Sequence, residues 1–161
     1  MAVLRGVASF HELWERRTSL QVEDEVVDLL ATEDLIQAKK TQLDKDWPMI
    51  RRPLERHCFE HAGQAGAADV AFWLRELRTP ELLLQVAAEY HQAAQAASTV
   101  RTAVRSAIEG DLAGVSRAIA DEEQDERTRD RSYWEPLRRE LEAMRRQKKA
   151  GQAGRPAPPS D

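Results

Sequence analysis

Two hydrophobic patterns divide the chain, a short-period one near the N-terminus and a helical one over the rest. Residues that favour β-structure cluster in residues 18–22 and 26–30, on either side of the polar sequence Glu23-Asp24-Glu25. Two such segments around a short polar turn predict a β-hairpin. Before them, Ser9 with Glu12 three residues later forms the capping-box pattern that opens a short helix.

Two helices are predicted between this hairpin and a glycine-containing connector at residues 63–66. The first opens at Thr32, and the second covers residues 47–59, with Pro48 in its first turn. Pro53 falls inside the second helix, where proline removes a backbone hydrogen bond and clashes with the preceding turn. We therefore expect a kink or a break at Pro53.

Beyond the connector, the apolar residues follow a helical period almost to the C-terminus. Boundary signals at Thr79-Pro80, Gly110-Asp111 and Ser132 with Glu135 divide this region. The predicted helices lie near residues 68–78, 80–109, 112–130 and 133–149. Two apolar faces are expected to pack: Val100, Val104 and Ile108, and, on the last helix, Trp134, Leu137, Leu141 and Met144.

The predicted fold is mostly α-helical. A short N-terminal helix and β-hairpin form a small α+β portion, followed by a helical bundle. The tail from Gly151 to Asp161 has three prolines and no large apolar side chain, which predicts disorder. The change of character at the connector divides the chain into residues 1–62, 63–149 and 150–161.

Composition narrows the class of protein. The chain has 161 residues, enough for one domain with a hydrophobic core, and its net charge of −4 argues against a protein that coats nucleic acid. Its single cysteine, Cys58, excludes an internal disulfide and fits a reducing compartment. Apolar runs are far shorter than the roughly 18 residues of a membrane span. The sequence thus predicts a cytoplasmic protein.

Lys39, Lys40, Lys45 and Asp46 are the candidate site residues. Two lysines close a predicted helix, and a Lys-Asp pair follows shortly after. Cations beside a triphosphate offset the charge that develops during phosphoryl or nucleotidyl transfer. Lysines at a helix C-terminus also complement the helix dipole without any further function, so both interpretations stay open.

The stretch that contains these residues resembles a known family. Residues 34–52 read DLIQAKKTQLDKDWPMIRR and are similar to the lysine and Lys-Asp motifs in the C-terminal part of minimal nucleotidyltransferases of the polymerase-beta-like superfamily. Residues 4–14 resemble the segment after the third catalytic carboxylate of such enzymes. Residues 72–80 and 131–137 resemble extensions of an uncharacterised bacterial subgroup, so most of residues 4–145 is covered. The chain departs from the subgroup at Leu43, which replaces an arginine, and at Pro53, which replaces a leucine.

The resemblance implies a nucleotidyltransferase-like protein without catalysis in this chain. Intact relatives bind a nucleoside triphosphate and two magnesium ions through a Gly-Ser turn, an Asp-x-Asp motif and a third carboxylate, and no Gly-Ser dipeptide occurs here. It implies that the chain begins downstream of a catalytic half, with no catalytic residue and no cofactor of its own. An exposed strand edge near residues 26–30 would then invite a protein partner or self-association.

The alternative is a helical protein-interaction module, in which the Trp134 face or the Val100 face docks a partner helix. Two other site hypotheses are weaker. His57, Cys58 and His61 lack the fourth ligand of a structural zinc site. The acidic residues 121–130 and the basic residues 138–149 could serve a nucleic-acid grip, but they fit a solvated helix better.

Overall fold

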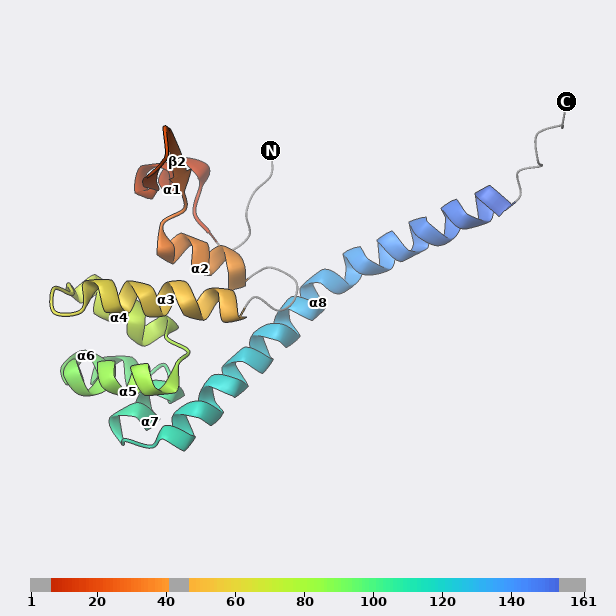
Figure 1. The fold of residues 1–161 in the computed structure, drawn as a ribbon. Coiled ribbons are helices and arrows are strands. Elements are labelled where there is room, and N and C mark those ends of the chain that lie inside the picture. Colours follow the sequence, from red (N-terminus) through yellow and green to blue (C-terminus); the bar gives the residue numbers. More distant parts are fainter. Residues whose placement is uncertain (1–6, 41–46, 154–161) are drawn as a thin grey trace, which may run out of the picture.

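The computed structural model describes residues 7–40 and 47–153, which form one two-stranded sheet and eight helices (Figure 1). The elements are α1 (Phe10–Arg16), β1 (Thr18–Val22), β2 (Glu25–Leu29), α2 (Thr32–Lys40), α3 (Trp47–His61), α4 (Ala67–Glu76), α5 (Pro80–Glu89), α6 (His91–Ser98), α7 (Thr102–Ile108) and α8 (Leu112–Ala153). The mostly helical fold with an N-terminal helix and hairpin is confirmed. Residues 154–161 of the predicted tail lie outside the described residues.

The N-terminal elements form as their sequence signals predict. The backbone N–H of Ser9 donates to Glu12 Oε2 over 2.9 Å, and the Ser9 side chain accepts from the Glu12 backbone, which completes the capping box of α1. Strands β1 and β2 pair antiparallel around the two residues Glu23 and Asp24. Glu23 has a φ of 53°, a left-handed conformation that lets so short a turn close.

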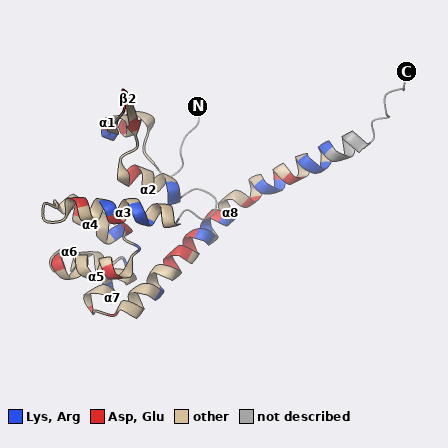
Figure 2. Ribbon diagram, viewed as in Figure 1, with Lys and Arg blue, Asp and Glu red and all other residues tan. Residues whose placement is uncertain are grey.

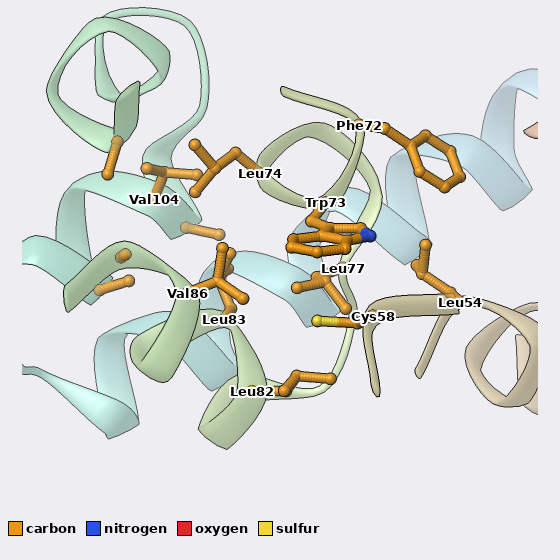
Figure 3. Packing of buried hydrophobic residues seen from close by; sticks show 14 of the residues in the cluster. Leu54, Cys58, Phe72, Trp73, Leu74, Leu77, Leu82, Leu83, Val86 and Val104 are labelled. Atoms are coloured by element: carbon orange, nitrogen blue, oxygen red, sulfur yellow. The ribbon is translucent and has the colours of Figure 1, made fainter. Parts of the chain in front are cut away.

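The hydrophobic core lies between α3, α4, α5, α7 and the first half of α8. Trp73 is fully buried near its centre, beside Leu54 and Cys58 of α3 and Leu77 at the end of α4 (Figure 3). Val115 and Ile119 bring α8 onto the same core, and Ile36 brings α2. The core therefore joins residues from both sides of the 63–66 connector.

The predicted helix over residues 80–109 is wrong, because the chain forms three shorter helices there. Tyr90, at φ −111° and ψ 50°, leaves helical geometry and separates α5 from α6. Arg101 is extended and precedes α7. These turns fold α5, α6 and α7 back on one another, so that Ala94, Ala103 and similar small residues can be buried between them.

The predicted boundary at Ser132 is also wrong, since α8 is one helix of 42 residues. At roughly 1.5 Å per residue it is about 60 Å long. Gly110, with a φ of 73°, and Asp111, whose Oδ1 accepts from the Gly114 N–H, set its start as predicted. Residues after Gly114 are mostly strong helix formers, and they outweigh the capping pattern at Ser132.

The two predicted packing faces are wrong in part. Leu137, Leu141 and Met144 are 43%, 44% and 53% exposed. They belong to the half of α8 that extends away from the bundle, where no other described helix lies beside it (Figure 1). Val104 is buried and Ile108 partly buried, but Val100 precedes α7 and lies in solvent.

Helix α3 runs through Pro53 without the predicted break. Burial of Ile50, Leu54 and Cys58 along one side of α3 outweighs the loss of a single backbone hydrogen bond at Pro53. No helix in the described ranges is long and apolar enough to cross a membrane.

Candidate functional site

Lys40, in the last turn of α2, lies between two carboxylates from distant parts of the chain. Its Nζ is 3.0 Å from Glu76 Oε2 on α4 and 3.4 Å from Glu126 Oε1 on α8. Arg78 is buried and donates to the same Glu126 oxygen over 2.7 Å. Two cations and two carboxylates therefore meet where α2, α4 and α8 come together.

Glu76 is the centre of this ion-pair cluster and is only 2% exposed. Burial by itself raises the pKa of its carboxyl group. The charge and hydrogen bond of Lys40, together with hydrogen bonds from Arg75 and Gln37, lower the pKa by more than burial raises it, so the net shift is downward. Gln37 Nε2 donates to Glu76 Oε1 over 2.9 Å. Glu76 is thus an ionised, fully bonded carboxylate that fixes Lys40.

This geometry bears on the four candidate residues. Lys40 faces two carboxylates, so a phosphate group would have to compete with them for the ammonium group. Lys39 is half-buried in the same helical turn. Lys45 and Asp46 lie outside the described residues, and whether the four form a nucleotide-side surface stays a prediction.

His57, Cys58 and His61 share the end of α3 without forming a metal site. Among the described residues, no group of three or more His, Cys, Asp or Glu side chains could hold a metal ion. The imidazole rings of His57 and His61 stack with 4.2 Å between centroids, and Trp73 Nε1 donates to His57 Nδ1 over 3.0 Å. Burial raises the pKa of the Cys58 thiol to about 11, which leaves it protonated and unreactive.

The acidic run of α8 holds the helix to the bundle. Glu122 pairs with Arg101, Glu123 with Arg51 and Glu126 with Arg78. Figure 2 shows acidic residues along the part of α8 that lies beside the other helices, before the more basic projecting half. These ion pairs were not predicted from the sequence. Glu122, Glu123 and Glu126 nevertheless follow Ile119 by three, four and seven residues, a spacing that places them on the buried face of α8.

The β-hairpin shows a second candidate site, which we call the apolar hairpin face. The register pairs Leu20 with Val27 and Thr18 with Leu29, so that the side chains of Leu20, Val22, Val27 and Leu29 lie on one face. These four are 39–52% exposed. The other face carries Ser19, Gln21, Val26 and Asp28, with a hydrogen bond from Ser19 Oγ to Asp28 Oδ1.

Further apolar side chains are exposed next to the hairpin. Phe10 and Trp14 of α1 stack with 5.7 Å between ring centroids, and both are exposed. Arg17 lies over the Trp14 ring at 4.2 Å and pairs with Asp28. The main core cluster lies in α2 to α8, so the exposed side chains of Phe10 and Trp14 add apolar surface next to the apolar hairpin face.

Comparisons with protein-family models, with curated proteins and with solved structures find no match to this chain. The resemblance to minimal nucleotidyltransferases therefore rests on the quoted motifs.

Proposed function

We propose that this chain is a non-catalytic binding module that is similar to the C-terminal part of minimal nucleotidyltransferases. In this proposal its apolar hairpin face docks on another protein. The observation that carries the proposal is the register of β1 and β2, which gathers Leu20, Val22, Val27 and Leu29 on one uncovered face. An isolated two-stranded hairpin is marginal in water, and a cover on its apolar face would stabilise it.

The charge of the hairpin indicates the chemistry of the partner. Glu23, Asp24 and Glu25 follow one another at the turn, and Glu25 pairs with Val22 at the end of the apolar face. A complementary surface is apolar where it meets Leu20 and Val27 and carries lysine or arginine where it meets the turn. Such complementarity speeds encounter and becomes weaker at high salt.

The ion-pair cluster supports a binding role rather than transfer chemistry. Lys40 is held by Glu76 and Glu126, which stabilises the junction of α2, α4 and α8 below the hairpin. In this proposal a nucleoside triphosphate and magnesium belong to an intact relative. The purified chain is expected to transfer no label from nucleoside triphosphates to RNA or protein acceptors, and metal-dependent transfer would contradict the proposal.

Site-specific photo-crosslinking in the cells that express the protein tests the docking face. A photoreactive residue in place of Leu20 or Leu29 is expected to trap one and the same protein. The matched controls replace Ser19 or Gln21, which neighbour Leu20 but lie on the opposite face. Equal trapping from both faces, or none from Leu20 and Leu29, would contradict the proposal.

A purified partner then allows the surface to be measured. Leu20→Lys is expected to weaken binding about tenfold or more, because it places a charge in the centre of an apolar contact. Val26→Lys adds the same charge to the other face and should change the affinity by less than about threefold.

A further inference from the structure

We propose that the projecting half of α8 is a dimerisation helix, which pairs in parallel with α8 of a second copy of this chain as a two-stranded coiled coil. Trp134, Leu137, Leu141 and Met144 follow one another at intervals of three, four and three residues. That is the spacing of positions a, d, a and d in two successive heptads, which forms a continuous seam on one side of a helix. This surface is separate from the apolar hairpin face.

Three of the four seam residues are accessible for such pairing, and Trp134 at the start of the seam is half-buried. The first half of α8 uses Val115 and Ile119 to pack on the bundle, whereas Leu137, Leu141 and Met144 lie beyond it and remain exposed. In Figure 1 this half of α8 extends past the other helices, so a second helix could lie along it. Exposed large apolar residues in a row are the surface that coiled-coil pairing buries.

Charges beside the seam indicate which partner and which direction fit. With Trp134 at position a, Arg138 and Arg145 occupy position e, and Glu140 occupies position g. In a parallel pair each g residue faces the e residue five positions later in the partner helix, so Glu140 of either copy meets Arg145 of the other. An antiparallel pair would instead place the arginines of position e near one another. Charge complementarity therefore favours a parallel pair of identical chains.

The remaining positions stabilise the single helix without blocking the seam. Glu135 pairs with Arg139, and Glu142 pairs with Arg146, at the outer positions b and f. Pro136 occupies position c, so the backbone hydrogen bond that it removes is on the outer side of the helix. The missing hydrogen bond at Pro136 is therefore on the side of the helix opposite the seam.

Two heptads are fewer than the three or four of a typical coiled coil, so the dimer should be weak, and its fraction should rise with protein concentration. Sedimentation equilibrium between about 1 µM and about 1 mM covers the range of weak dimers. The mass is expected to rise from that of the 18.3 kDa monomer toward twice that value. A monomer at every concentration would overturn the proposal.

Two pairs of variants locate the contact. Leu141→Asp places a charge in the seam and should abolish the rise in mass, whereas Ala143→Asp places it at the outer position c and should not. Arg145→Glu sets like charges against Glu140 and should weaken association, whereas Arg146→Glu at position f should leave it near that of the unmodified chain. Since all four side chains are exposed, circular dichroism should show each variant folded. Equal behaviour within either pair would overturn the proposed seam.

Disulfide trapping tests the direction. In a parallel pair, position d of one copy faces position d of the other, so Leu137→Cys and Met144→Cys should each give a covalent dimer under mild oxidation. In an antiparallel pair at most one of them can. Arg146→Cys, on the outer side, is the control, and the native Cys58 is buried. Trapping through only one of the two d positions would overturn the parallel arrangement.

Discussion

His57 carries a structural hydrogen bond that depends on its protonation state. Its Nδ1 accepts from the indole N–H of the buried Trp73, and an imidazole nitrogen can accept only when it bears no proton. Partial burial, followed by the neighbouring His61, lowers the pKa of His57 below its usual value of about 6.5. The folded protein therefore favours the neutral ring.

This pKa shift predicts how stability depends on pH. Above about pH 6.5 the ring is neutral in both states and its contribution is fully present. As the pH falls below that value, the unfolded chain takes up the proton more readily, so the free energy of unfolding decreases until the pH passes the lower folded pKa. Denaturant unfolding at a series of pH values measures it. His57→Gln should remove this part of the pH dependence, and the exposed His91→Gln should keep it; identical curves for the two variants would contradict the assignment.

Arg101 satisfies the carbonyl groups at the end of α4. Its Nη1 donates to Leu74 O over 2.8 Å and its Nη2 to Leu77 O over 2.7 Å. The same guanidinium pairs with Glu122 of α8 over 2.9 Å. One largely buried side chain thus connects α4, α7 and α8.

We expect Arg101→Ala to lower the free energy of unfolding by about 3 kcal/mol, because two carbonyls and a half-buried carboxylate lose their donor. Arg105→Ala, on the exposed side of α7, should change it by less than about 0.5 kcal/mol. Urea denaturation of both variants gives the comparison. A cost for Arg101→Ala as small as that for Arg105→Ala would show that the pairs in this cluster are not stabilising.

At the scale of elements, α8 has two halves with different surroundings. Ile119 is buried against the bundle, and Leu141 is exposed. Ile119→Ala should cost about 2 to 5 kcal/mol, the usual range for a buried residue of this size. Leu141→Ala should cost under about 0.5 kcal/mol when unfolding is measured at low protein concentration. A large cost at Leu141 would mean that the projecting half packs within its own chain.

Local sequence signals predicted several elements because their residues act through neighbours in the chain. The capping box at Ser9, the strands around Glu23-Asp24-Glu25 and the helix start at Pro80 are of this kind. The divisions at Tyr90 and at Ser132 were not predictable in the same way. Tyr90 leaves helical geometry where tertiary packing folds α6 back, and Ser132 remains helical despite a capping pattern.

The candidate site could be predicted only in part. Lys40 was found from its position at a helix end, but its partners Glu76 and Glu126 are 36 and 86 residues away in the sequence, so no local pattern indicates them. The sequence predicted the hairpin, and the family resemblance implied an exposed strand edge near residues 26–30. Its apolar face depends on the pairing of Leu20 with Val27, which the cross-strand register determines.

For the molecule as a whole, a helical body carries two uncovered apolar surfaces, the hairpin face near the N-terminus and the seam of α8. The body is held by its core and by the ion pairs of Lys40, Arg101 and Arg51 with acidic residues. Proteins that act by docking require accessible surface of this kind on a stable body. If the hairpin face is stabilised by docking, the hairpin alone should be much less stable than the helical body.

Amide hydrogen exchange along the purified chain tests this most directly. Backbone amides of Leu20 and Val27 are expected to exchange with almost no protection, whereas amides of Leu83 and Val104 in the core should approach the protection given by global unfolding. Addition of the partner protein identified by photo-crosslinking should then slow amide exchange in β1 and β2 and leave the exchange rates in α5 unchanged. If the hairpin amides of the purified chain were as protected as those of α5, this would contradict the claim that the apolar hairpin face is stabilised by docking on a partner.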